Sequence, residues 1–397
     1  MLSTWTFLLF VIASLALYWL LVPTKARSVY LAIISFAYFY GLFPDQRQGL
    51  LFILVLAVLV YISGMIIRKH QDKTRAVMIS GIVVLVGILA YFKYAAFLAD
   101  TLNIALIPLL KYKLTVPKVF IPIGISYFIF KMIHYVVDSF KGKIEEHSPA
   151  DFLNYIFFFP ILISGPIERF QPFLANLKAG DRFSMENIYA GLPRIASGLF
   201  KKVVLADTLG ATAAMMQQPN LTAEQYWLAS FAYTLQLYFD FAGYSDMAIG
   251  ISRLFGFTIM ENFDWPYLAQ NVSDFWKRWH RSLTGWFRDY LFIPIGGSRG
   301  GLGLVIRNTL IVMAVTGLWH GAGWHFVFWG LYHAVGLIAL RLYRKFLLPS
   351  FKCRTSFFDS KLSAVISTLI TFNFVNIGWI FFACDANQSI YVLTHMF

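Results

Sequence analysis

The sequence predicts an all-α, polytopic transmembrane protein, and three observations support this fold class. Of 397 residues, 58% are hydrophobic and only 13% are charged, whereas soluble domains carry about 25% charged residues. The apolar residues suffice for about ten or eleven membrane crossings at about 20 residues each. Basic and non-basic loops alternate along the first spans, as a multi-pass topology requires.

The net charge of +13 arises from 33 Lys and Arg against 20 Asp and Glu. Because no soluble domain is expected, we interpret this excess as loop charge that meets anionic lipid headgroups, and not as a nucleic-acid site. The two cysteines, Cys353 and Cys384, form no metal-binding pattern and predict no structural disulfide.

The first apolar segments set the expected orientation. Lys25 and Arg27 follow the apolar run that ends at Val22, so we expect an uncleaved anchor with an extracytoplasmic N-terminus. The strongly basic loop 68–75 is then cytoplasmic. The expected spans after the anchor are residues 29–43, 49–67 and 76–98.

The middle of the chain is less regular. Lys131, His134 and Asp138 interrupt an apolar run that ends at Phe140, and such groups normally face a protein interior or a watery cavity. Residues 152–166 are too short and too interrupted by proline for a simple span, which is typical of buried or cavity-lining segments. A polar stretch, 176–187, separates this half from the apolar segments 188–205 and 226–252.

Residues 271–290 predict an interfacial amphipathic helix. Its apolar positions, including Trp276, Trp279 and Trp286, recur at helical spacing, and its basic residues lie on the other side. Asn271 is a plausible cap at its start. His280 falls at the border between the two faces.

A helical pair is expected next, over 302–319 and 324–340, with a last full span over 362–383. His320 follows Arg307 by 13 residues, which corresponds to about 20 Å along a helix. If Arg307 marks an interface, His320 lies inside a hydrocarbon layer about 30 Å thick. Gly321 and Gly323 allow a break or a close helix approach beside it.

Most of the eight histidines are interpreted as structural. His134, His325 and His333 lie on apolar segments and are expected to be satisfied core residues. His320 is different, because an intramembrane imidazole beside a glycine-rich break can take a proton from a hydroxyl. No metal site is expected, and 296–300, which formally matches G-x-S-x-G, is interpreted as a basic loop.

The second half of the chain contains five distinctive motifs: Tyr238-Phe-Asp-Phe-Ala-Gly-Tyr-Ser-Asp-Met-Ala-Ile-Gly250, Glu261-Asn-Phe, Asp274-Phe-Trp-Lys-Arg-Trp-His280, Trp286-Phe-Arg-Asp-Tyr-Leu-Phe-Ile-Pro294 and Gly317-Leu-Trp-His-Gly-Ala-Gly-Trp324. These motifs resemble the membrane-bound O-acyltransferase (MBOAT) family, in the bacterial branch of alginate and peptidoglycan O-acetyltransferases. The resemblance covers most of the chain as one integral-membrane domain over 1–397, with a motif core at 238–330. It implies a ring of helices around a thinner centre, where a tunnel joins a cytoplasmic donor to an extracytoplasmic acceptor.

The resemblance implies that His320 is catalytic, with His280 as a second characteristic histidine that orients or relays. It implies an acyl thioester donor, most simply acetyl-CoA, with no bound cofactor. The acceptor is a polysaccharide hydroxyl or a serine of an extracytoplasmic acetyltransferase partner, at the bacterial inner membrane. Candidate donor-binding residues are Trp276, Lys277, Arg278, Arg281, Trp319 and Trp324.

Two alternatives remain open on the sequence. The same fold transfers D-alanine from a carrier protein to teichoic acid. A transporter or flippase of lipid-linked sugars could instead use His320 as a proton relay, although no internal repeat is visible. Members of the alginate branch usually continue with further hydrophobic segments, so a chain that ends at Phe397 is expected to be truncated or a short member.

Overall fold

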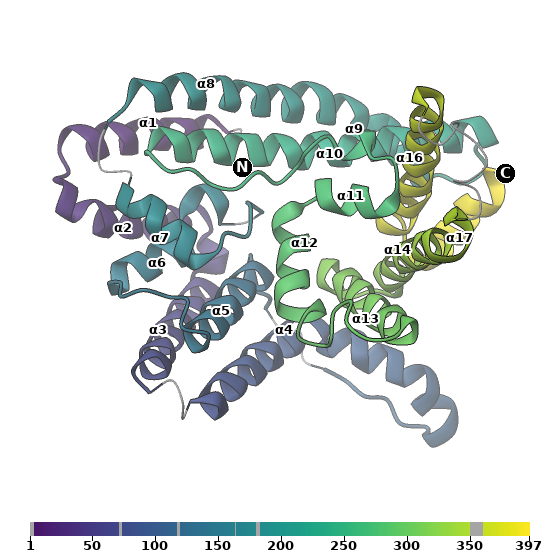
Figure 1. Cartoon of the computed structure of the whole chain (residues 1–397), viewed down its shortest axis with the longest axis horizontal. Helices are drawn as coiled ribbons and strands as arrows, with labels where there is room; N and C mark the ends of the chain where they lie inside the picture. Colours follow the sequence, from purple (N-terminus) through teal and green to yellow (C-terminus); the bar gives the residue numbers. More distant parts are fainter. Residues whose placement is uncertain (1–3, 71–73, 117–119, 163, 180–182, 350–359) are drawn as a thin grey trace. The chain divides into compact units, whose positions relative to one another are not determined.

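A computed structural model describes residues 4–70, 74–116, 120–162, 164–179, 183–349 and 360–397. Every regular element in these ranges is a helix (Figure 1), which confirms the expected all-α class. The α-helices are α1 Trp5–Leu20, α2 Arg27–Leu42, α3 Arg47–Lys69, α4 Arg75–Leu110, α5 Ile125–Phe140, α6 Pro149–Phe157, α7 Phe170–Ala179, α8 Met185–Leu199, α9 Asp207–Ala214, α10 Ala223–Leu254, α11 Val272–Arg278, α12 Arg281–Phe287, α13 Leu302–His320, α14 Trp324–Leu342, α16 Lys361–Ala383 and α17 Ala386–His395. Shorter 3₁₀ or π turns are Thr24–Ala26, Pro44–Gln46, Phe159–Ile161, Phe200–Ala206, Met215–Gln217, Pro266–Leu268, Arg288–Phe292 and Tyr343–Leu347.

The chain divides into two compact units. The first unit contains Met1–Leu199 and Tyr244–Met260, and the second contains Phe200–Gly243 and Glu261–Phe397. Helix α10 contributes residues to both.

Five helices in the described ranges are long and apolar enough to cross a membrane. They are Pro44–Lys69, Arg75–Leu110, Leu302–His320, Trp324–Leu347 and Lys361–Ala383, and the shorter apolar helix Trp5–Leu20 joins them. This number is below the ten or eleven crossings expected from composition. Hydrophobic residues also fill helices of 16 residues, such as α2 and α5, and the short helices around Pro160.

The ionisable groups of α5 face the protein interior of the first unit. A protein interior is one of the two environments expected for them, the other being a watery cavity. The Lys131 ammonium donates to the carbonyl oxygens of Tyr155 (2.9 Å) and Ile156 (3.2 Å). His134 shares a 2.8 Å hydrogen bond with the Tyr155 hydroxyl and accepts from the Phe170 amide at 3.1 Å. His134 is therefore the satisfied core histidine that the sequence predicts.

The proline-broken segment after α5 is also confirmed. Helix α6 starts with a capping box, in which the Ser148 hydroxyl accepts from the Asp151 amide and the Asp151 carboxylate accepts from the Ser148 amide. It ends at Phe157, and a 3₁₀ turn over Phe159–Ile161 replaces further helix. The Asn154 side chain donates to the Ser28 carbonyl oxygen at 2.6 Å, which ties α6 to α2.

Helices α13 and α14 form an antiparallel hairpin in the second unit, and glycine permits their close approach (Figure 1). A Cβ atom at Gly317 would lie 2.1 Å from the Phe326 carbonyl oxygen, and one at Gly330 would lie 2.2 Å from that of Met313. Both distances are far below van der Waals contact, and both obstructing atoms belong to the backbone. The two helices therefore pack at this separation only because both positions are glycine.

Replacing Gly317 by alanine should force the hairpin apart and lower the unfolding free energy by about 1–3 kcal/mol, as overpacked cores do. Gly303→Ala is the matched control on the same helix, because nothing lies within 4 Å of a Cβ there. That variant should be neutral or gain about 0.5–1 kcal/mol of helix stability. Thermal unfolding of both purified variants measures the difference; equal melting temperatures would contradict the packing argument.

Candidate active site

His320 is the last residue of α13, and the chain leaves the helix at Gly321 in an extended conformation. The His320 ring lies 4.7 Å from the ring of Trp319, 5.0 Å from Trp329 and 4.9 Å from Phe382, measured between centroids. A Cβ atom at Gly321 would strike the Phe326 ring, at 1.9 Å. The expected glycine-rich break beside His320 is therefore confirmed, and aromatic rings from α13, α14 and α16 surround the imidazole.

The prediction of one continuous amphipathic helix over 271–290 is wrong, because the helix is broken in its middle. Helix α11 ends at Arg278 and α12 begins at Arg281, with His280 between them in the left-handed region (φ 42°, ψ 54°). His280 is 1% exposed, so it does not lie at the border of an interfacial helix. The spacing of the apolar residues fits one continuous helix, but the chain turns at His280, and this turn buries the imidazole.

Asn262 holds His280 in place. The His280 Nδ1–H donates to the Asn262 side-chain oxygen at 3.1 Å, and that oxygen also accepts from the Ser282 hydroxyl at 2.9 Å. The Arg281 amide donates to the Asn262 carbonyl at 2.9 Å. Because Nδ1 carries the proton, the lone pair of the imidazole is on Nε2, which has no hydrogen-bond partner among the described residues.

Burial lowers the pKa of His280 to about 3, because a charged imidazole is poorly solvated in the protein interior. His280 is therefore neutral at physiological pH. A neutral imidazole with a fixed tautomer and an open Nε2 can accept a proton or a hydrogen bond from a substrate.

Trp319 connects the two histidines that the sequence singled out. Its ring lies 6.1 Å from the His280 ring and 4.7 Å from the His320 ring. Trp319 is 7% exposed. The structure thus brings His280 and His320 to the same indole, although 40 residues separate them in the sequence.

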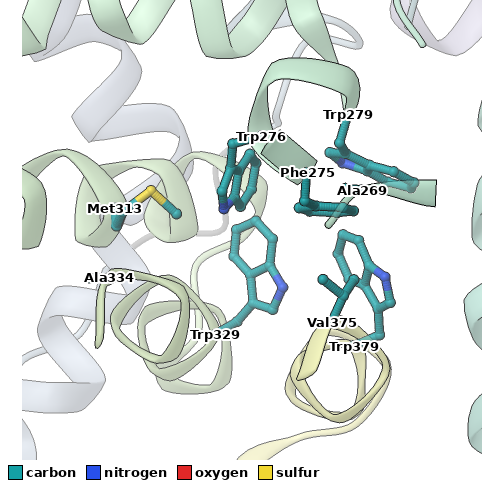
Figure 2. Packing of buried hydrophobic residues seen from close by; sticks show 9 residues of the cluster. All are labelled: Ala269, Phe275, Trp276, Trp279, Met313, Trp329, Ala334, Val375 and Trp379. Atoms are coloured by element: carbon teal, nitrogen blue, oxygen red, sulfur yellow. The ribbon is translucent and has the colours of Figure 1, made fainter. Parts of the chain in front are cut away.

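An aromatic core supports this arrangement (Figure 2). Trp329 from α14 stacks on Trp379 from α16 at 5.5 Å, and Trp276 from α11 meets Trp329 edge-on at 5.7 Å. His333 lies against the same indoles, 5.1 Å from Trp276 and 5.2 Å from Trp329. His333 was expected to be a satisfied core histidine; it is fully buried, but neither ring nitrogen has a hydrogen-bond partner in the described part of the chain.

The expected donor-binding residues are scattered. Lys277 and Arg281 are exposed, and Arg278 is held by Asp274 in a 3.0 Å ion pair. Trp324 begins α14 and is 45% exposed. Trp276 and Trp319 are buried, with Trp276 against His333 and Trp319 against His280 and His320.

Two adjacent cavities, of about 430 Å³ and 140 Å³, lie beside α13 instead. Four residues line both cavities: Phe292, Val312, Met313 and Leu337. The larger cavity is also lined by Arg341 and Arg344, and the smaller by Arg288, Trp276 and Thr316. Of the expected donor-binding residues, only Trp276 lines either cavity.

The cavities follow one face of α13 toward His320. Lining positions 306, 309, 313 and 316 recur every three or four residues, and His320 continues this spacing. From Ile306 to His320 the helix rises about 21 Å. Together the cavities extend along α13 from Ile306 to Thr316, with Arg341 and Arg344 lining the larger cavity and Arg288 the smaller. The smaller cavity reaches Thr316, one turn before His320, which itself lines neither cavity.

Sequence reasoning missed Asn262, Arg341 and Arg344. Asn262 stands in the Glu261-Asn-Phe motif, whose presence was noted without a role. The two arginines lie just beyond the expected helix 324–340, and the sequence assigned them no role. The described residues contain no group of three or more His, Cys, Asp or Glu that could hold a metal ion, and 296–300 forms a turn with left-handed glycines, in agreement with the expected loop.

Comparisons with known proteins agree with these motifs. The pattern of the membrane-bound O-acyltransferase family matches residues 83–380. A probable alginate O-acetylase of Pseudomonas aeruginosa is 36% identical over 385 residues, which cover 96% of this chain and 71% of that protein. A peptidoglycan O-acetyltransferase of Helicobacter pylori is 34% identical, and the match covers 85% of this chain and 68% of that protein. A teichoic acid D-alanyltransferase of Bacillus subtilis is 31% identical, and the match covers 66% of this chain and 68% of that protein.

Replacing Asn262 by leucine removes the oxygen that accepts from both the His280 Nδ1–H and the Ser282 hydroxyl. The 3.3 Å contact between Ser282 Oγ and His280 Nδ1 can satisfy only the imidazole, so at least the Ser282 hydroxyl should be left buried without an acceptor. The expected cost is about 1–3 kcal/mol of unfolding free energy for each unsatisfied group. Asn373→Leu on α16 is the matched control, because that half-buried side chain bonds only to a carbonyl of its own helix. Melting temperatures test this; a control that melts as low as Asn262→Leu would refute the special role of Asn262.

Proposed function

Because the chain belongs to the membrane-bound O-acyltransferase family, we propose that it moves an acetyl group from a cytoplasmic thioester to a hydroxyl on the other side of the membrane. The acceptor is an extracytoplasmic polysaccharide, the class of polymer that the names of the alginate and peptidoglycan relatives indicate. One observation carries the mechanism: His320 ends the helix face that lines the two cavities.

His320 acts as the general base. Its imidazole takes the proton of the acceptor hydroxyl while that oxygen attacks the thioester carbonyl carbon. The new C–O bond forms, the C–S bond breaks, and the protonated His320 gives that proton to the leaving thiolate. Surrounding rings of Trp319, Trp329 and Phe382 exclude water, which protects the thioester from hydrolysis.

His280 supports the reaction from the other edge of Trp319. With Nδ1–H fixed by Asn262, its Nε2 lone pair accepts a hydrogen bond from the acceptor hydroxyl or from a relaying group. This role depends on tautomer and position, and not on a charged imidazole.

The donor, most simply acetyl-CoA, enters through the two cavities beside α13. Arg341 and Arg344 line the end far from His320, where guanidinium groups suit the phosphates of a nucleotide-bearing thioester. The apolar floor along α13 accommodates the arm that carries the thioester toward His320. This route replaces the expected one over Lys277, Arg278 and Arg281.

Acetyl transfer is favoured over transfer of D-alanine. The alginate O-acetylase match covers 96% of the chain, whereas the D-alanyltransferase of B. subtilis covers 66% at lower identity. The chain is a multi-pass membrane protein. We place it in the bacterial inner membrane with its N-terminus outside, and we expect an extracytoplasmic acetyltransferase partner that passes the acetyl group to the polymer.

His320→Ala should reduce transfer by about a hundred- to ten-thousand-fold, the usual contribution of a general base. His320→Gln should be equally impaired, because an amide keeps hydrogen bonding but cannot take the proton. The measurement is transfer of radiolabelled acetyl groups from acetyl-CoA in membranes that contain matched amounts of protein.

His395→Gln, on exposed α17, is the matched control and should keep normal transfer. Near-normal activity of His320→Gln would show that His320 acts only as a hydrogen-bonding group, and the base would then lie elsewhere.

Replacing both Arg341 and Arg344 by alanine should raise the KM for acetyl-CoA by about tenfold or more, since hydrogen bonds to charged groups contribute about 1.5–3 kcal/mol each. The KM for acetyl-pantetheine, which lacks the phosphates, should change little, and kcat should be kept. Arg299→Ala, in the exposed loop outside both cavities, is the control. Equal losses for both donors would rule out phosphate recognition by these arginines.

A further inference from the structure

A separate cavity of about 740 Å³ lies in the first unit, where α3 and α5 end. Its polar lining includes Arg68 and Lys69 from the end of α3 and Glu145 and Glu146 from the loop after α5. Helix α3 belongs to a candidate membrane span, Pro44–Lys69. The cavity therefore lies at the end of a span, at the level where lipid headgroups are expected.

Charges of both signs line this cavity without pairing with each other. Arg68 donates to the Tyr135 hydroxyl at 2.8 Å, a neutral partner. Glu145 lies 3.9 Å from Lys178 in an exposed contact. Lys69 and Glu146 have no ion pair among the described residues.

A chain of hydrogen bonds holds part of the cavity lining in place before any ligand binds. The Tyr135 hydroxyl, which accepts from Arg68, bonds to His147 Nε2 at 3.0 Å, and His147 Nδ1–H donates to the Glu145 carbonyl oxygen at 2.8 Å. This chain fixes the Arg68 guanidinium and the backbone that carries the two carboxylates. Burial lowers the pKa of His147, so its imidazole is neutral and adds no charge to the wall.

The Ser139 hydroxyl is a second sign of a ligand. Ser139 lines the cavity and is fully buried, and its oxygen has no hydrogen-bond partner among the described residues. Buried hydroxyls are nearly always hydrogen-bonded. A phosphate oxygen in the cavity would accept this hydrogen bond.

We propose that this cavity binds the zwitterionic headgroup of a phosphatidylethanolamine-type lipid. The phosphate lies against Arg68, Lys69 and Ser139, and the primary ammonium lies against Glu145 and Glu146. A zwitterion bridges the two sets of charges, which an anionic lipid cannot do. Tyr61, Met65 and Ile144 supply the apolar part of the lining, against which the glycerol and the start of the acyl chains pack.

The test is competition between lipids for the purified full-length protein in detergent, measured by native mass spectrometry. Phosphatidylethanolamine should bind more tightly than phosphatidylglycerol or phosphatidylcholine. Lys69→Ala and Glu146→Gln, both at exposed side chains, should each weaken it by about three- to fivefold, the size of one partly exposed ion pair. Arg75→Ala and Glu186→Gln are the controls, because neither residue lines the cavity, and both should bind like the parent protein.

Three results would overturn the proposal. Equal binding of phosphatidylglycerol, with no effect of Glu146→Gln, would assign the cavity to anionic lipids. Equally tight binding of soluble glycerophosphoethanolamine would assign it to a free phosphoamine and not to a lipid. Unchanged phosphatidylethanolamine binding by both cavity variants would place the lipid elsewhere on the protein.

Discussion

The arrangement of the second unit depends on the backbone contact between α13 and α14. Gly317 and Gly330 let the two helices approach until the backbone of one lies against the Cα atoms of the other. This approach sets Trp329 against the His320 ring, and it places α14 where Trp276 and Trp379 can pack on Trp329. Close helix packing through small residues is a common way to gain van der Waals contact where the hydrophobic effect gives little drive for association.

Features that depend on local sequence were predictable. A span is a continuous apolar run with basic residues beyond its end, so α3, α13 and α14 lie close to their expected ranges. The break after His320 was predictable because Gly321 and Gly323 disfavour helix locally. The inward-facing Lys131 was predictable as well, since an ammonium group cannot remain in hydrocarbon.

Features that depend on contacts between distant segments were not predictable. The periodicity of 271–290 favours one helix, but Asn262 offers its side-chain oxygen and its carbonyl to residues 280–282, which favours a turn there. The two cavities beside α13 take their walls from α11, α12, α13 and α14, so the sequence alone could not show that Arg341 and Arg344 line one of them. The resemblance to the family singled out His280 and His320 as candidates, but it could not show that Trp319 lies against both.

The backbone conformation of His280 affects the thermal stability of this protein. A residue other than glycine in the left-handed region costs about 1–2 kcal/mol, and asparagine or glycine would adopt φ 42° more easily. The imidazole therefore occupies a position that favours other residues on conformational grounds. Selection for heat resistance alone should replace this histidine, whereas selection for the role proposed for His280 should retain it, so under that proposal the position marks a compromise between durability and catalysis.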